Sequence, residues 1–241
     1  MRDVVKGFAL ALSMLTTLPF FRVHEFSKGI NGYSVMAYPL VGFLLGSLLY
    51  GTYLLLAPFV PPFHLGVIIF ALWVLLTGAL HLDGLSDTID GLYVPKERAL
   101  EVMKDPHNGG MGMIFGGVFL ILKASSLAAF NMFYLLPIVL MLPRLATVFA
   151  IYFFPYVSPS GMGSLAKEEL KSWQVWMAFS YTLLLSFFFD SFLLLLLTFG
   201  IVFVIKSFFI KRYGGFTGDI YGFSIELTEL LLLNAILVGL V

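Results

Sequence analysis

Long apolar runs alternate with short polar segments along most of the chain. Each run holds about 20 residues, the length that an α-helix needs to cross the hydrocarbon core of a bilayer. We therefore predict an all-α polytopic membrane protein with about seven transmembrane helices, forming a single integral-membrane domain over residues 1–241. The predicted spans are 35–57, 63–82, 113–133, 135–156, 173–189, 191–210 and 223–241.

The first apolar segment, residues 4–21, is short for a span and contains Pro19. If it crossed the membrane, Arg2 and Lys6 would lie on the side that is poor in basic residues, against the positive-inside rule. We therefore predict an interfacial or re-entrant helix. Its basic start and apolar middle are typical of a signal peptide, but no clear cleavage site follows, so we expect the segment to be retained.

The basic residues give the expected orientation. Twelve of the fourteen Lys and Arg residues lie at the N-terminus or in four loops on the same side, and the other two lie inside spans. The positive-inside rule makes that side cytoplasmic. We predict a multi-pass protein of the cell (inner) membrane, with its polar loops and its active site on the cytoplasmic face. The four loops are 22–34, 83–112, 157–172 and 206–222.

The amino-acid composition limits the kinds of partner that the chain is expected to have. With 60% hydrophobic and only 12% charged residues, the chain is expected to be surrounded by a lipid bilayer. A formal net charge of zero gives no basis for binding nucleic acid. The absence of cysteine excludes disulfides, thiolate metal sites and cysteine nucleophiles. A homo-oligomer is compatible with the sequence, which does not specify one.

The most unusual segment is 81–112, which holds six of the fourteen acidic residues. Asp83, Asp87 and Asp90 are spaced i, i+4 and i+7, so a helix would present all three on one face. Carboxylates placed in this way repel each other, and Mg²⁺ is a hard cation that takes oxygen ligands. A charge run of this kind is often a solvated loop, but its start directly after an apolar run favours a functional site.

Other polar residues are candidates for binding an anion. Lys123 and Arg144 lie inside apolar runs, where each either pairs with a structural carboxylate or contacts a phosphate. Gly218 and Asp219 belong to a glycine-rich segment, KRYGGFTGDIYG, whose backbone N–H groups are suited to holding phosphate. For Glu226, the simplest interpretation is a lysine partner. Together with the acidic segment, these residues predict metal-assisted phosphoryl or nucleotidyl transfer to an alcohol.

Residues 81–91 read HLDGLSDTIDG and closely resemble the HLDGLADTxDG signature of the cobalamin synthase (adenosylcobinamide-GDP ribazoletransferase) family. Four more segments resemble motifs of that family in the same order, so the resemblance covers the whole chain. They are TLP at 17–19, YPLVGFLLG at 38–46, EVMKD with two later glycines at 101–112, and GFTGD at 215–219.

The resemblance implies a Mg²⁺-dependent integral membrane enzyme. It would join adenosylcobinamide-GDP to α-ribazole, or to α-ribazole 5′-phosphate, giving adenosylcobalamin or its 5′-phosphate and releasing GMP. On this basis we assign Asp83, Asp87, Asp90 and Asp105 as metal ligands, Asp90 also as general base with His81 as second choice, and Lys104, His107, Gly109, Gly112, Lys123, Arg144, Gly218 and Asp219 as substrate-binding residues.

The chain departs from the family pattern at one point. The family usually has Asp-Ser-Arg where this chain has Asp105-Pro106-His107. If that arginine contacts a phosphate in the family, His107, Lys104 or Arg98 would have to make the contact in this chain.

Two alternative functions stay open. Residues 87–91, DTIDG, match the start of the D-x-x-D-G-x-x-A-R motif of CDP-alcohol phosphotransferases, but the following residues 92–94, LYV, break the remainder. A cation-coupled transporter is the alternative from another class. Transporters often carry internal repeats with binding sites at mid-membrane, and the chain has no internal repeat and few charges within its spans.

Overall fold

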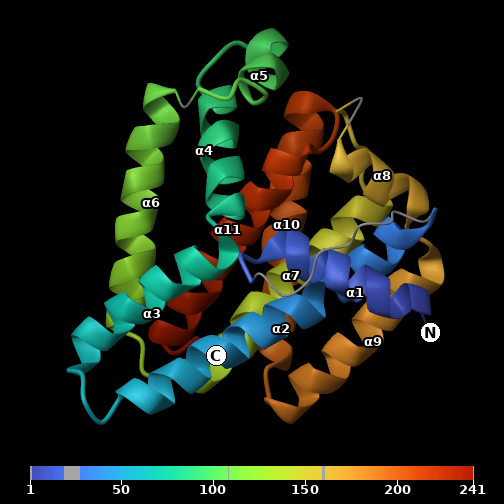
Figure 1. Cartoon of the computed structure of the whole chain (residues 1–241). Helices are drawn as coiled ribbons and strands as arrows, with labels where there is room; N and C mark the ends of the chain where they lie inside the picture. Colours follow the sequence, from blue (N-terminus) through green and yellow to red (C-terminus); the bar gives the residue numbers. More distant parts are fainter. Residues whose placement is uncertain (1, 19–27, 108, 159–160, 241) are drawn as a thin grey trace.

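The computed structural model describes residues 2–18, 28–107, 109–158 and 161–240. The regular elements in these ranges are all helical, so the prediction of an all-α protein is confirmed (Figure 1). The helices are α1 (Arg2–Leu15), α2 (Ile30–Leu56), α3 (Pro62–Thr77), α4 (Leu80–Leu92), α5 (Lys96–Val102), α6 (Gly110–Ala128), the 3₁₀ turn η1 (Phe133–Leu135), α7 (Leu136–Phe153), α8 (Met162–Glu169), α9 (Ser172–Phe188), α10 (Phe192–Tyr213) and α11 (Gly218–Leu237).

Several helices have the length and composition of membrane spans. In the described part of the chain these are α2, α6, η1 with α7, α10 and α11, and a sixth span results if α3 and α4 are taken as one bent span. The chain is therefore a polytopic membrane protein. The prediction of seven spans is not confirmed, because α9, which corresponds to the predicted fifth span, has only 17 residues.

Helix α7 forms the centre of the bundle. In the most apolar 18 residues of each span, 89% of the residues are buried in η1 and α7, but only 33% in α2 and in α10. Helix α2 packs closely on α7 because Gly42 and Gly46 lack side chains. A Cβ at either position would lie 2.4 Å from a carbonyl oxygen of α7, that of Leu140 or Leu136. Small residues at this spacing let two membrane helices approach closely.

Helix α1 agrees with the predicted short N-terminal helix. Its 14 residues would extend for only about 21 Å, so it is too short to cross a bilayer alone. It lies along α2 (Figure 1), where Gly7 is in close contact with Tyr33. Residues 19–21 of the predicted segment, and residues 22–27 of the loop after it, lie outside the described residues.

The predicted span 63–82 is wrong at its C-terminal end, because α3 ends at Thr77 and α4 begins at an angle of 85° to it. Gly78 and Ala79 have φ of 60° and 56°, in the left-handed region. A helix cannot continue through two such residues, and an alanine rarely adopts this conformation. Thr17 stabilises the break, because its backbone N–H and its hydroxyl donate to the carbonyl oxygens of Leu76 and Leu75, each at 2.9 Å.

Two predicted loops are shorter than expected. Residues 157–172 contain helix α8, whose Lys167 donates to three carbonyl oxygens at the C-terminal end of α7. The glycine-rich segment 211–222 is mostly helical, because α10 continues to Tyr213 and α11 already begins at Gly218. Lys167 therefore caps α7, and Gly218 and Asp219 lie on the first turn of α11.

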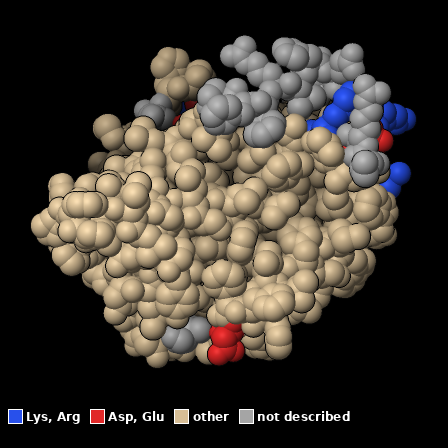
Figure 2. All heavy atoms as spheres, turned by 60° about the horizontal axis from the view of Figure 1, so that its bottom comes forward, with Lys and Arg blue, Asp and Glu red and all other residues tan. Residues whose placement is uncertain are grey.

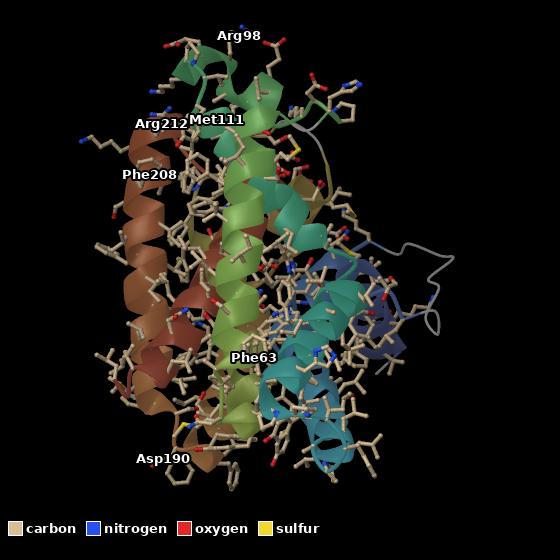
Figure 3. The ribbon with its side chains drawn as sticks, turned by 90° about the vertical axis from the view of Figure 1, so that its left-hand side faces the viewer. Phe63, Arg98, Met111, Asp190, Phe208 and Arg212 are labelled. Atoms are coloured by element: carbon tan, nitrogen blue, oxygen red, sulfur yellow. The ribbon has the colours of Figure 1, made fainter. Side chains whose placement is uncertain are left out.

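The charged side chains are concentrated at one end of the bundle. Figure 3 shows Arg98 and Arg212 at that end and Asp190 at the opposite end. Figure 2 shows a broad surface without Lys, Arg, Asp or Glu, with charged atoms only near its margins. This arrangement is what the predicted orientation requires, and the assignment of the charged end to the cytoplasm stays a prediction.

Candidate active site

Helix α4 carries the acidic motif and positions its carboxylates. The predicted helical arrangement is confirmed, since Asp83, Asp87 and Asp90 all lie on α4 within Leu80–Leu92. Asp83 is exposed, Asp87 is half-buried and Asp90 is buried. Along α4, the acidic face that they share therefore passes from solvent at Asp83 to the protein interior at Asp90.

Close packing of α4 on α11 brings a further carboxylate to this face. A Cβ at Gly84 would lie 2.9 Å from the carbonyl oxygen of Asp219, and a Cβ at Gly222 would lie 3.1 Å from that of His81. Only glycine allows the two helix backbones to come this close. Asp219, on the first turn of α11, is thereby held beside the acidic face of α4.

The resulting carboxylates repel one another. The negative charges of Asp83, Asp219 and Asp90 all act on the carboxyl group of Asp87. Among the described residues, neither Asp83 nor Asp87 forms an ion pair, and Lys104 is the exposed cation that acts on Asp219. The cluster therefore has a net negative charge with no built-in counterion at α4.

As the described side chains stand, no three carboxylate or histidine groups converge closely enough to enclose a metal ion. Mg²⁺ does not need such an enclosure, because it is commonly held by one or two carboxylates together with water and substrate phosphates. Asp83, Asp87 and Asp219 fit this kind of site.

Asp90 has a different environment from that of Asp83 and Asp87. Its Oδ2 accepts from the backbone N–H of Gly109 and its Oδ1 from that of Gly112, both at 2.8 Å. These are unsatisfied N–H groups at the start of α6, where a negative charge is also favourable. Both carboxylate oxygens therefore cap α6, and the same contacts explain why Gly109 and Gly112 are glycines. The roles of Asp90 as ligand or base stay predictions.

Asp105 and His107 lie in the connection between α5 and α6, and both are exposed to solvent. Their side chains are 2.7 Å apart, and the backbone N–H of His107 also donates to Asp105 at 3.0 Å. These bonds stabilise the carboxylate, and the pKa of Asp105 is lowered as a result. The two residues border a surface depression that Asp90 also reaches. The described structure does not bring Asp105 to Asp83 or Asp87 as a shared set of ligands.

A cavity of about 200 Å³ lies next to the acidic cluster, between α4, α7 and α11. Three of the residues that line it have buried polar atoms without a hydrogen-bond partner: Nδ1 of His81, Nε and Nη2 of Arg144, and the hydroxyl of Tyr221. A buried polar atom that is left unpaired is costly. These unpaired atoms make His81, Arg144 and Tyr221 candidates for hydrogen bonds to a polar ligand in the cavity. The wall also includes Asp83, Gly218 and Asp219.

The two intramembrane cations have carboxylate partners. Lys123 donates to Glu226 and to Glu229, each at 2.6 Å, and Arg144 donates to Glu229 at 2.8 Å. The lysine partner predicted for Glu226 is confirmed. For Lys123 the geometry favours the structural alternative, because its ammonium group binds two buried carboxylates and it is not among the residues that line the cavity. Arg144 has both kinds of contact, an ion pair and a place in the cavity wall.

Sequence reasoning did not find every residue of the cavity wall. Tyr38 of α2, Gly163 of α8 and Tyr221 of α11 were not assigned to the site. A weak signal existed for two of them, because Tyr38 opens the YPLVGFLLG segment and Tyr221 follows Asp219 in the GDIYG segment. Nothing in the local sequence indicated that α8 would reach the cavity.

Comparison with known proteins gives a consistent result. The family model described as cobalamin-5-phosphate synthase matches residues 7–237. A relative from Thermosynechococcus vestitus is 42% identical over 83% of this chain and 84% of its own length. One from Pseudomonas aeruginosa is 36% identical over 98% and 99%, and one from Desulfitobacterium hafniense is 34% identical over 93% of each. All three are named adenosylcobinamide-GDP ribazoletransferase. No solved structure matches the chain.

Proposed function

We propose that this chain, which belongs to the cobalamin-5-phosphate synthase family, is an adenosylcobinamide-GDP ribazoletransferase. A hydroxyl group of α-ribazole, or of its 5′-phosphate, would attack the diphosphate of adenosylcobinamide-GDP. A new phosphate ester bond forms, the bond to the guanosine nucleotide breaks, and GMP leaves. The family match gives no support to the two alternative functions, a CDP-alcohol phosphotransferase and a transporter.

The observation that carries the proposal is the acidic cluster beside a cavity with unpaired donors. Asp83, Asp87 and Asp219 are the residues that would hold Mg²⁺, because they combine mutual repulsion with a lack of ion pairs at α4. Mg²⁺ held there would supply positive charge against the negative charge that develops during phosphoryl transfer. Asp90 is a less favourable ligand, since both of its oxygens already accept hydrogen bonds from Gly109 and Gly112, and Asp105 is less favourable because the described structure does not bring it to Asp83 or Asp87 as part of a shared set.

The cavity offers groups for the remaining steps. His81 is the better candidate for the general base, because its Nδ1 is unpaired in the cavity whereas both oxygens of Asp90 are engaged. Arg144 is the candidate for binding the diphosphate, through the nitrogens that have no partner. Gly218 and Asp219, on the first turn of α11, are placed where backbone N–H groups favour an anion. Lys104 and His107 are exposed residues suited to the nucleotide.

The location of the site fits a reaction at the membrane surface. Helix α4, which carries the acidic cluster, is followed directly by α5 at the charged end of the bundle (Figure 3), and we propose that this end is the cytoplasmic face of the cell membrane. A soluble nucleotide product could leave directly into the cytoplasm from that position.

The experiment that tests the proposal is a GMP-release assay. Purified protein in proteoliposomes is given adenosylcobinamide-GDP and α-ribazole, with and without Mg²⁺ and without any ion gradient. We expect GMP release only when both substrates and the metal are present. Release without metal would contradict the assignment of the acidic cluster. No release at all would contradict the transferase function itself.

A further inference from the structure

The guanidinium group of Arg144 is held on one side only. It is fully buried, and its Nη1 donates to Glu229 at 2.8 Å and to the carbonyl oxygen of Leu140 at 2.6 Å. Its Nε and Nη2 have no partner, and Arg144 lines the cavity beside His81. Nε and Nη2 form one edge of a guanidinium group. Two parallel hydrogen bonds from such an edge can hold a phosphate or carboxylate group.

Glu229 determines the direction of that edge. It is fully buried on α11, and its two oxygens have separate partners: Oε1 accepts from Arg144 and Oε2 from Lys123 at 2.6 Å. A carboxylate fixed at both oxygens cannot turn to follow the guanidinium group, so it anchors Nη1 in one place. The guanidinium group is planar, so once Nη1 is fixed, only the edge formed by Nε and Nη2 is left to bind another group.

Lys123 acts on the far side of Glu229. Its ammonium group is bound by Glu226 and Glu229 and lies 4.2 Å from the ring centre of Trp73. It therefore holds Glu229 from the side opposite to Arg144. The two cations and two carboxylates balance in charge, so the cluster can be buried in the membrane interior without a net charge.

From these contacts we infer that Glu229 is a positioning residue, which orients Arg144 so that its Nε and Nη2 edge binds phosphate oxygens of the substrate diphosphate. Lys123 supports Glu229 and does not touch substrate. This inference rests on the proposed function, since it assigns a diphosphate to the cavity. It adds a residue that does not itself contact the reacting atoms.

The chain offers a matched pair of variants. Glu229→Gln and Glu226→Gln each remove one negative charge beside Lys123, but only Glu229 contacts Arg144. Glutamine has a single acceptor oxygen, so the new side chain of Glu229→Gln cannot accept from both Arg144 and Lys123, whereas that of Glu226→Gln can still accept from Lys123. We expect Glu229→Gln to raise the KM for adenosylcobinamide-GDP by about tenfold or more while the KM for α-ribazole stays within about twofold. Glu226→Gln should leave both KM values within about twofold of the wild type. Equal effects of the two variants on the donor KM would overturn the inference.

A double-mutant cycle with Arg144→Lys tests whether Glu229 acts through Arg144. Lysine keeps the positive charge for Glu229 but lacks the edge that holds two oxygens. We expect Arg144→Lys to raise the donor KM, and Glu229→Gln to add no more than about twofold in that background. Full, independent effects of the two substitutions would overturn the inference.

Melting curves in detergent control for folding. If Glu229→Gln does not fold, the test rests on Arg144→Lys. An unchanged KM for adenosylcobinamide-GDP in folded Arg144→Lys would show that the Nε and Nη2 edge of Arg144 does not bind the substrate, and would overturn the inference. A wild-type protein that releases no GMP contradicts the proposed function. An active wild type in which Glu229→Gln and Glu226→Gln behave alike contradicts only the positioning role.

Discussion

The Oδ1 atom of Asp90 accepts a hydrogen bond of 2.8 Å from the backbone N–H of Gly112. The bond joins α4 to the first turn of α6, and it leaves no room for a side chain at position 112. A Cβ there would lie 2.4 Å from Oδ2 of Asp90 and 2.5 Å from Oγ of Ser86. A glycine that sequence reasoning assigned to substrate binding is thus required for helix packing.

The first prediction concerns this contact. Gly112→Ala should destabilise the protein by about 1–3 kcal/mol, because the new methyl group displaces the Asp90 cap. Gly110→Ala, on the same turn of α6, has nothing within 4 Å of its Cβ and should be neutral or slightly stabilising. Melting temperatures of the two variants in detergent provide the comparison. Equal melting temperatures would show that the cap contributes little.

The second prediction concerns the acidic face of α4. Asp83→Asn and Asp87→Asn should each lower kcat for GMP release by about 10²-fold or more, since a lost metal ligand removes several kcal/mol of transition-state stabilisation. The same variants should be at least as stable as the wild type in metal-free buffer, because each removes a repulsive charge. They should also lose part of the rise in melting temperature that Mg²⁺ produces in the wild type.

Asp190→Asn is the matched control for these substitutions. It makes the same chemical change at the opposite end of the bundle (Figure 3), and asparagine tolerates the positive φ of 49° at that position. Activity and the Mg²⁺ effect on melting should both be unchanged. A metal effect that is retained in Asp87→Asn would exclude this residue from the metal site.

The third prediction concerns the break between α3 and α4. In an ordinary helix, Gly→Ala stabilises and Ala→Gly destabilises by about 1 kcal/mol. At positions 78 and 79, we expect each stability change to have the opposite sign or to be close to zero. Gly78→Ala should cost about 1–2 kcal/mol because the residue is left-handed, and its Cβ would meet Thr17 Cγ2 at 2.9 Å. Ala79→Gly should not destabilise the protein. The free energies of unfolding of both variants, measured side by side, check the two signs.

The fourth prediction concerns orientation in the membrane. The chain has no cysteine, so single cysteines can be introduced without removing any. Phe59→Cys, in the turn between α2 and α3, is at a position that is 82% exposed and should react only with a reagent added outside the cell. Arg98→Cys, at the charged end in Figure 3, should react only from the cytoplasmic side. Labelling of both cysteines from the same side would contradict the predicted topology.

Local patterns predicted part of the fold and of the site. The spacing of Asp83, Asp87 and Asp90 correctly gave a helix with one acidic face, because helical periodicity depends only on neighbours in sequence. The short helix α5 begins directly after Pro95, whose fixed φ suits the residue that precedes a helix.

Features that depend on distant residues could not be predicted in the same way. The break at Ala79 has no signal in its own residue type, and it is stabilised by Thr17, which lies in the segment after α1. The pairing of Lys123 with Glu229 joins residues 106 positions apart. The cap formed by Asp90 requires a helix that begins 20 positions later, at Gly110. Each of these depends on how whole helices pack.

The ion pairs around Glu229 also constrain the order of assembly. Synthesis proceeds from the N-terminus, so Lys123 and Arg144 are made before either of their carboxylate partners. Glu229 follows Arg144 by 85 residues, which corresponds to roughly 4–17 s of translation. During that interval α6 and α7 carry two cations without counterions, and only the insertion of α11 neutralises them. The insertion of α11 therefore completes the charge balance of this buried cluster.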